Sequence, residues 1–281
     1  MKIPKTFMGE RIEDILRQPE PDAQSPEAKG EHGLTNLIDP KNWIFLQSRQ
    51  HGIHEYPDLY VCLHRLGYDA KVEEAVKKAG LDFNPQNSAT HSDNVPYIGN
   101  INYGQAMRLA KAVSYPLSLR TGVDFLKEIR DGSNGTKVVY DGNRTKIDNK
   151  ILETAYEEIV KVRKPWRSEW FSDRFGENTI TFTLIKPDGT TQEITESLES
   201  CLMEDKKLGI DLNAWLQKAN SQGLPIKKTA KGDLYYWHPV NGSVARFDAN
   251  SGRAYLNCYW DAGYSDVALG VRLVALAPEK N

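Results

Sequence analysis

The sequence lacks the features that place many proteins in a class at once. Its 281 residues include 3 cysteines, Cys62, Cys201 and Cys258, without a CxxC or CxxH pair, which argues against a zinc ribbon or a redox-active dithiol. Free thiols in a reducing compartment are the preferred interpretation, and one long-range disulfide is the alternative. No apolar run approaches the roughly 18–20 residues of a membrane span, and none follows Lys2 as in a secretory signal. We therefore expect a cytoplasmic or virion-associated protein without a membrane span.

An excess of charge of one sign is also absent. Lys and Arg together number 36, Asp and Glu number 38, and the formal net charge is −2. Because nucleic-acid binding depends on a concentrated basic face that releases counterions, we predict no nucleic-acid partner. Apolar residues make up 40% of the chain and charged residues 26%, which is normal for a globular protein with a substantial core.

Four helices are predicted from capping residues and apolar spacing. The first lies in "DAKVEEAVKKAGL", between Asp69 as its cap and the glycine that ends it. The second begins after Asn102, with Gln105 at the capping-box position. Thr121 is expected to cap the third, and the fourth is expected over residues 149–162.

Most of the predicted strands come after these helices. "NWIFLQSR" suits an early buried strand, and "NTITFTLIKPDGTTQEITESL" predicts a hairpin around a Pro-Asp-Gly turn. "DLYYWHP", "SVARFD" and "LGVRLVAL" add further strands. Because helices and strands form separate blocks, the predicted fold class is α+β. We expect a loosely ordered arm over residues 1–38, with a short helix over 9–16, followed by one domain over 39–281 with an inserted region at about 130–230.

Two stretches resemble the C-type lectin fold in its formylglycine-generating-enzyme-like branch. "INYGQAMRLAKAVSYPLSLRTGVDFLKEI" is similar to the branch's two helices around an "LPT"-like turn, and Leu119-Arg120-Thr121 stands at the turn without its proline. The closing "LGVRLV" is similar to the branch's terminal "GVR-V" strand. The resemblance implies a C-type lectin-like fold, with few helices around short, mostly antiparallel strands and long loops.

Residues 245–274, together with the two residues before them, resemble the variable region of proteins diversified by retroelements: "SVARFDANSGRAYLNCYWDAGYSDVALGVRLV". In such proteins, copying errors at template adenines scatter certain codons into Tyr, Asp, Ser, Gly and others. The resemblance implies a fixed frame of Val244, Ala245, Arg246, Phe247, Ala249, Arg253, Ala254, Leu256, Cys258, Leu269, Gly270, Val271 and Arg272. It also implies variable, ligand-binding positions at Asp248, Asn250, Gly252, Tyr255, Asn257, Tyr259, Trp260, Asp261, Gly263, Tyr264 and Asp266.

The composition of this segment points to binding without the resemblance. Aromatic residues make up 10% of the chain, but eight lie within residues 235–264: Tyr235, Tyr236, Trp237, Phe247, Tyr255, Tyr259, Trp260 and Tyr264. Tyr and Trp beside Ser, Gly and Asn are the mixture found in binding loops. We expect Tyr235, Trp237 and Phe247 to be structural and Tyr255, Tyr259, Trp260 and Tyr264 to be exposed for binding. The alternative is that these rings belong to the core and that the polar residues form turns.

Catalysis finds less support in the sequence, and we expect neither catalytic residues nor a metal or other cofactor. His51 and His54 in "HGIHE" suit one helical face, with His64 downstream, but the zincin spacing is absent. The resembled enzymes use a pair of closely placed cysteines, whereas Cys258 stands alone near the C-terminus. An enzyme that uses Cys258 or these three histidines remains the alternative function. We expect "RKPWRSEWFSDRF" to pack its rings inward and to pair Arg167 or Arg174 with Glu169 or Asp173 on the surface. The preferred function is therefore recognition of a protein or glycan on another cell.

Overall fold

The computed structural model describes residues 6–7, 10–11, 38–78, 80, 97–161, 166–229, 231–250 and 252–278. The chain divides into two compact units, residues 1–33 and 34–281. In the first unit, strand β1 (Thr6–Phe7) pairs antiparallel with β2 (Glu10–Arg11). The helix expected over residues 9–16 is therefore wrong at positions 10 and 11, which are extended, and its other residues lie outside those described.

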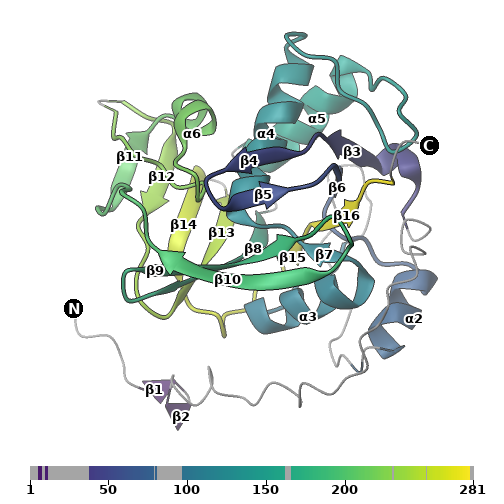
Figure 1. Ribbon diagram of the computed structural model, residues 1–281. Coiled ribbons are helices and arrows are strands. Elements are labelled where there is room, and N and C mark those ends of the chain that lie inside the picture. Colours follow the sequence, from purple (N-terminus) through teal and green to yellow (C-terminus); the bar gives the residue numbers. More distant parts are fainter. Residues whose placement is uncertain are drawn as a thin grey trace. The chain divides into compact units, whose positions relative to one another are not determined.

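The second unit is α+β and contains two larger sheets and a separate hairpin (Figure 1). Within the described residues, the larger sheet has the strand order β10-β9-β8-β13-β14-β12-β11, and β15 also pairs with β8. Its strands are β8 (Arg167–Gly176), β9 (Thr179–Ile185), β10 (Thr191–Ser197), β11 (Lys206–Ile210), β12 (Leu234–Trp237), β13 (Ser243–Ala249), β14 (Ala254–Trp260) and β15 (Leu269–Val271). Most pairs are antiparallel, but β12 runs parallel to β14 and β15 runs parallel to β8.

The smaller sheet has the strand order β3-β6-β16-β7. Its strands are β3 (Trp43–Leu46), β6 (Leu59–Cys62), β16 (Leu273–Leu276) and β7 (Tyr115–Pro116), and the separate hairpin consists of β4 (Arg49–His51) and β5 (His54–Tyr56). The described helices are the 3-10 helix η2 (Pro40–Asn42) and the α-helices α2 (Ala70–Lys78), α3 (Tyr103–Val113), α4 (Leu119–Ser133), α5 (Asn149–Val160) and α6 (Leu212–Lys218).

Local signals explain where α2 and α3 begin. The Asp69 side chain accepts a hydrogen bond from the backbone N–H of Val72 at the start of α2. At α3, Asn102 Oδ1 accepts from the N–H of Gln105, and Gln105 Oε1 accepts from the N–H of Asn102. This reciprocal pair is the predicted capping box, and it satisfies two N–H groups at the helix end.

Helix α4 begins earlier than predicted. Its N-cap is Ser118, whose Oγ accepts from the N–H of Thr121, so Thr121 lies inside the first turn and is not the cap. The carboxylate of Asp173 accepts a hydrogen bond from the N–H of Leu119. It thereby satisfies a second N–H group of the first turn, where the helix itself provides no acceptor. That contact comes from strand β8, more than fifty residues away, and local spacing does not reveal it.

The predicted hairpin of β9 and β10 is confirmed. Ile185 pairs with Thr191 across the Pro-Asp-Gly turn, and Gly189 in that turn has φ of +79°, a conformation that favours glycine. The expected strands at 43–46, 234–237 and 243–249 are also present, and "LGVRLVAL" forms β15 and β16.

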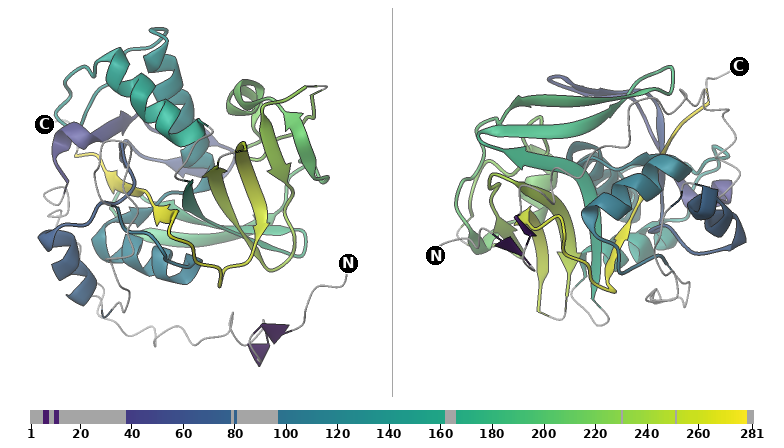
Figure 2. Two further views of the ribbon diagram at one scale, coloured as in Figure 1. Left: turned by 180° about the vertical axis from the view of Figure 1, so that it is seen from behind. Right: turned by 90° about the horizontal axis from the view of Figure 1, so that it is seen from below.

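Two apolar clusters hold these elements together. The larger contains the inward face of α4, with Val123, Leu126 and Ile129, together with Phe171 of β8 and Phe247 of β13. The smaller joins α3 to β15, β16 and the first strands of the second unit. The two views of Figure 2 show β13 and β14 side by side, with the closing strands β15 and β16 in yellow. The segment expected to vary therefore starts in the larger sheet and leads directly into this core.

Candidate binding cavity

Strand β14 contains an irregularity that decides which of its side chains share a face. Across from β13, Asn257 pairs with Arg246 and Trp260 pairs with Val244, so three steps on β14 match two steps on β13. This is the pattern of a β-bulge, in which one extra residue re-aims the side chains that follow. The bulge places Trp260 on the face of Tyr255 and Asn257. Simple alternation assigns that place to Tyr259.

A cavity of about 230 Å³ opens on this face. Seven of the eleven expected variable positions line it: Asp248, Asn250, Tyr255, Asn257, Trp260, Tyr264 and Asp266. The rest of its lining is Trp166, Arg167, Ser168, Trp237, Arg246, Ala249, Ala268 and Leu269. One connected hollow therefore collects residues from β8, β12, β13, β14 and the connection to β15.

The other four expected positions lie outside this lining. Tyr259 is 41% exposed. Gly252 donates its N–H to Asn250 Oδ1, and Gly263 donates its N–H to Asp261 Oδ1. These two contacts are local turns closed by a short polar side chain. The turn-forming alternative therefore describes Gly252, Asp261 and Gly263 better than the binding interpretation does.

The polar wall of the cavity is built on β13. Arg246 Nε lies 2.9 Å from Asp248 Oδ2, and the Arg246 guanidinium lies 3.7 Å from the centre of the Trp260 ring. Burial raises the pKa of Asp248 to about 6, although the Arg246 charge opposes the shift. The second oxygen, Asp248 Oδ1, is buried without a hydrogen-bond partner. The polar wall therefore contains a buried carboxylate with one oxygen left unsatisfied.

Two expected binding residues are buried, and two others, Tyr255 and Trp260, are half-buried where exposure was expected. Asp248 is 6% exposed and Asn257 is 3% exposed, so the expectation of surface positions is wrong for both. They face the cavity from central strands, because β13 lies between β8 and β14, and β14 lies between β13 and β12. Asn257 Oδ1 also accepts from the N–H of Tyr259, within the bulge.

Aromatic rings form the remaining walls. The rings of Trp237 and Tyr255 lie 5.2 Å apart, and those of Trp260 and Tyr264 lie 5.2 Å apart at 83°. Trp166 is 51% exposed and Tyr264 is 39% exposed. Trp237 was expected to be structural, but it is half-buried and lines the cavity, whereas Tyr235 and Phe247 are buried as expected.

Strand β8 and the residue before it supply three cavity residues, Trp166, Arg167 and Ser168, from a stretch that the sequence favoured as structural and offered only second as a ligand site. Arg167 is buried, and its Nη2 forms an ion pair at 3.2 Å with Glu169 Oε2. The expectation of surface ion pairs is wrong for Arg167, Glu169 and Asp173, because all three are buried. Arg174 does form an exposed ion pair, but its partner is Glu193 and not Glu169 or Asp173. The alternation of cations and rings in this stretch was the available signal.

The three candidate histidines each contact a different carboxylate. The closest nitrogen–oxygen distances are 2.8 Å from His51 to Asp124, 3.0 Å from His54 to Glu196 and 3.3 Å from His64 to Glu158. The spacing of His51 and His54 suits one helical face, but Gly52 and Pro57 disfavour a regular helix, and this segment is the hairpin of β4 and β5. In the described part of the chain, no three His, Cys, Asp or Glu side chains are grouped to hold a metal ion.

The thiol of Cys258 is equally unsuited to chemistry. It is fully buried, and burial raises its pKa well above the ordinary value. A thiol held in its neutral form is a poor nucleophile and a poor metal ligand. Cys62, Cys201 and Cys258 are all free, and burial also raises the pKa of Cys201 to about 11, as it does that of Cys62.

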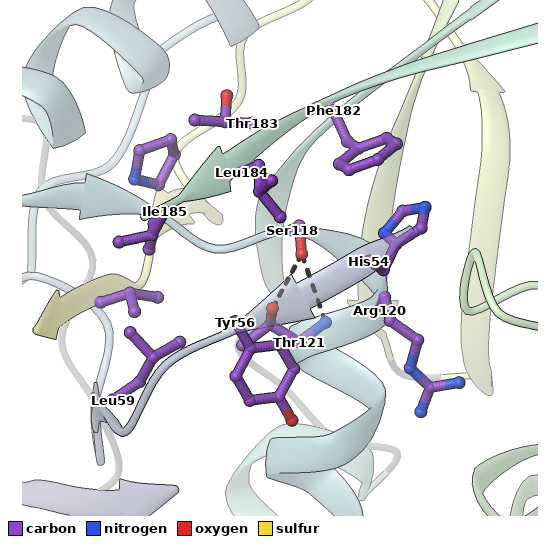
Figure 3. Close-up of a pocket in the computed structure, with 12 residues that line it drawn as sticks. His54, Tyr56, Leu59, Ser118, Arg120, Thr121, Phe182, Thr183, Leu184 and Ile185 are labelled. Carbon is purple, nitrogen blue, oxygen red and sulfur yellow. Dashed lines mark hydrogen bonds between the residues drawn. The ribbon is translucent and has the colours of Figure 1, made fainter. Parts of the chain in front are cut away.

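A second hollow lies beside the hairpin of β4 and β5 (Figure 3). His54 and Phe182 stack there with ring centres 3.6 Å apart, and the Ser118 hydroxyl contacts Thr121 below them. Its volume is about 10 Å³, which is space for one water molecule at most. It is therefore too small to be a ligand site.

No known protein family, curated protein or solved structure matches the chain. Among the described residues, no helix has both the length and the apolar character needed to cross a membrane. The candidate site therefore rests on the cavity itself.

Proposed function

We propose that the protein is a recognition protein that binds a ligand through the cavity face, formed by β13, β14 and the connection to β15. The observation that carries this proposal is that seven of the eleven positions that the resemblance marks as variable line one cavity. Aromatic walls around a few buried polar groups are typical of ligand sites. On the basis of the sequence resemblance, we further propose that the protein is a C-type lectin-like scaffold and that retroelement-driven variation diversifies this face.

The burial of the expected frame supports a surface that can change while the fold persists. The frame residues Val244, Ala245, Arg246, Phe247, Ala249, Ala254, Leu256, Cys258, Leu269, Gly270, Val271 and Arg272 are buried, and Arg253 is half-buried. Substitutions at exposed positions outside a packed core usually change stability by less than about 0.5 kcal/mol. Of the expected variable positions that line the cavity, Tyr264 is exposed, whereas Asn250 and Asp266 are half-buried and accept hydrogen bonds from backbone N–H groups. Tyr264 is therefore the lining position most free to vary.

The proposed target is a macromolecule, a protein or glycan on another cell. Half-exposed rings at the mouth of a partly buried cavity suit a group that projects from a larger partner, because Tyr and Trp provide wide contact at low entropic cost. The enzyme alternative gains nothing from the geometry, since Cys258 is held as a neutral thiol and the three histidines are each taken by a separate carboxylate.

Sequencing of the DNA around the gene tests the diversification. We expect a near-copy of the codons for residues 245–274 that differs only at adenines, next to a reverse-transcriptase gene. The absence of both from a complete genome contradicts diversification, and binding by the cavity face then needs its own support.

Two tyrosines of nearly equal exposure allow a matched test of binding. Tyr264 lines the cavity and is 39% exposed, whereas Tyr259 lies outside it and is 41% exposed. Fluorescently labelled protein is applied to a panel of intact bacterial and animal cells and measured by flow cytometry. We expect at least one cell type to bind, with Tyr264→Ala weakening binding about tenfold or more and Tyr259→Ala leaving it within about twofold.

Equal loss of binding by both variants, or no loss by Tyr264→Ala, contradicts the cavity as the binding site. Thermal melting of both variants is the control, and we expect both to stay within about 1 kcal/mol of the wild type because both side chains are partly exposed.

A further inference from the structure

We propose that strand β10 is a dimerisation edge, along which two copies of this chain pair antiparallel and extend the larger sheet across a two-fold axis. β10 forms one margin of that sheet, because among the described residues its only partner strand is β9 (Figure 1). No residue of β9 or β10 lines the cavity. The inference is therefore independent of the proposed function and leaves the cavity face uncovered.

Alternate residues of β10 direct their backbone groups away from β9. Just beyond the end of β10, Leu198 donates its N–H to the carbonyl of Asn178 across the hairpin. Because the direction of the backbone groups alternates along a strand, the even-numbered residues of β10 face β9 and the odd-numbered ones face outward. The outward residues are Thr191, Glu193, Thr195 and Ser197. The Ser197 carbonyl accepts from Gln222 Nε2, whereas within the described ranges the outward backbone groups of the other three have no hydrogen-bond partner.

Three other margins of the two larger sheets carry features that hinder pairing with another chain. β11 contains Lys206 and Lys207, and its register with β12 is irregular. β7 is two residues long and contains Pro116, and in β3 the N–H of Phe45 donates to the carbonyl of Tyr140. Lysine, proline, irregular register and coverage are the usual protections of a sheet edge. β10 has seven residues in regular register and contains neither lysine nor proline, so this margin is the one suited to pairing.

The two carboxylates of β10 already have partners within the chain. Glu193 Oε2 lies 2.8 Å from Arg174 Nη2. Glu196 Oε1 accepts a hydrogen bond from Gln222 Nε2 at 2.8 Å and lies 3.0 Å from His54 Nε2. Because both groups are engaged, the edge offers little attraction to a basic segment of another protein. It favours a partner strand of low net charge, such as a second β10.

One register makes β10 complementary to its own copy. With the two-fold axis at Ile194, Glu193 lies opposite Thr195 of the second copy, and Gln192 lies opposite Glu196 of the second copy. The half-buried Ile194, the one apolar residue of β10, then meets itself in a non-hydrogen-bonded pair, where side chains approach most closely. An axis at Glu193 places two carboxylates directly opposite each other, which is destabilising. The register about Ile194 is therefore preferred.

Sedimentation velocity of the full chain tests for the dimer. The protein is measured between about 1 and 100 μM, the range over which complexes of micromolar affinity dissociate. We expect the mass to rise with concentration to twice the 31.8 kDa of one chain. No larger species should form, because both copies use the same edge and pairing consumes it. A monomer at every concentration overturns the inference.

Two substitutions at one position test the role of the backbone. Thr195→Pro removes an outward N–H and leaves the hydrogen bonds to β9 in place. We expect it to weaken dimerisation about tenfold or more. Thr195→Ala, the matched control, loses the hydroxyl contact with Thr181 but keeps the N–H, and it should dimerise within about twofold of the wild type. Equal dimerisation by the two variants overturns the inference, provided that thermal melting shows both to be folded.

Cross-linking tests the register and is decisive if Thr195→Pro does not fold. Oxidised glutathione is added as the oxidant, and disulfide-linked dimers are counted on a non-reducing gel. Ile194→Cys places two thiols at the axis, so we expect it to cross-link. Gln192→Cys is the control on the same face, roughly 13 Å from its copy in this register, and it should not. The wild type, with its three native cysteines, gives the background. Cross-linking by neither variant, or only by Gln192→Cys, overturns the inference.

Cell binding separates this inference from the proposed function. Dimerisation without binding to any cell type leaves the inference standing and contradicts the proposed function. A monomeric wild type whose cell binding is lost in Thr195→Pro but kept in Thr195→Ala shows that the edge accepts a strand of another protein. That result overturns the pairing of two copies.

Discussion

Two buried carboxylates, Asp173 and Asp248, lie in surroundings that disfavour their charge. Burial raises the pKa of Asp173 to about 7 and that of Asp248 to about 6. Asp173 keeps one backbone partner, the N–H of Leu119, and its Oδ1 has none. In the unfolded chain both groups titrate near the ordinary value of about 3.9. Between about pH 4 and pH 7 these two groups therefore hold more protons in the folded chain than in the unfolded chain, and the stability that they contribute falls as the pH rises.

Replacement of Asp173 by Asn should remove much of this pH dependence. A shift of one pKa unit corresponds to about 1.4 kcal/mol, so ionisation of Asp173 lowers the free energy of unfolding by about 2–3 kcal/mol between pH 5 and pH 8. Urea unfolding at the two pH values should show that Asp173→Asn loses correspondingly less stability than the wild type. Measurement of both proteins in the same buffers cancels the contributions of other groups.

Asp188→Asn is the control for this prediction. Hydrogen bonds from the side chain and N–H of Thr190 lower the pKa of Asp188, so any effect of its titration lies below about pH 4. The same slope in Asp173→Asn and the wild type contradicts the assignment of the pH dependence to Asp173.

Residue types indicated the binding face, but not how deep each member lies. Tyr255, Trp260 and Tyr264 were predicted from aromatic enrichment, and all three line the cavity. The burial of Asp248 and Asn257 depends on their positions in central strands, and the exclusion of Tyr259 depends on the bulge in β14. Both causes are set by strand pairing, which composition does not contain.

At the scale of elements, one carboxylate holds the hairpin of β4 and β5 against helix α4. Asp124 of α4 is buried and accepts hydrogen bonds from Arg49 at 3.1 Å, from the hydroxyl of Tyr56 at 2.7 Å and from Arg120 at 2.8 Å. His51 lies 2.8 Å from the same carboxylate. These contacts hold the pKa of Asp124 well below its usual range.

Replacement of Asp124 by Ala should cost about 3–5 kcal/mol in the free energy of unfolding, because it leaves the buried Arg120 without a counter-charge. Replacement of Tyr56 by Phe removes one hydrogen bond and should cost about 1 kcal/mol. Urea unfolding of the two variants measures the difference. Costs of similar size for both contradict a role for the charge in holding the hairpin.

Elements with a local signal were predicted and those set by distant contacts were not. The capping box of α3 and the turn of β9 and β10 are complete within a few residues, and both are present. The start of α4 depends on Asp173 from β8, so Thr121 was chosen in place of Ser118. The turn of the hairpin at His51 and His54 contains Gly52, a local signal against the helical face that the spacing of the histidines suits.

At the scale of the whole second unit, Arg272 joins the two larger sheets. It lies between β15 and β16, donates to Glu169 of β8 at 3.0 Å, and donates to the carbonyls of Cys62 and Leu63 at the end of β6. Glu169 also contacts Arg167 at the cavity. Nearby arginines hold the pKa of Glu169 below its ordinary value against the effect of burial.

Replacement of Glu169 by Gln should destabilise the chain by about 3–5 kcal/mol, because two buried guanidinium groups lose their shared counter-charge. The matched control is Glu193→Gln, which removes an exposed pair with Arg174 and should change stability by less than about 1 kcal/mol. Urea unfolding distinguishes the two. Similar values for both contradict the role of Glu169 as a buried junction between the sheets.

The order of the strands in the sheets could not be predicted from the sequence. The pairings of β8 with β13 and of β12 with β14 join segments that local alternation cannot match. The α+β class followed from the blocks of helices and strands, which are visible along the chain. The cavity could not be predicted without the strand order, because its residues come from β8, β12, β13 and β14, which lie side by side in the sheet but far apart along the chain.

The bulge in β14 has a practical consequence for anyone who wishes to give the chain a new target. A combinatorial library built on strict alternation randomises the codons for residues 255, 257 and 259, and it spends a third of its diversity on a side chain outside the cavity. Because the extra residue shifts the register before Trp260 and the buried Asn257 side chain bonds to the backbone inside the bulge, the productive library keeps codons 257 and 259 fixed and randomises codons 255, 260 and 264.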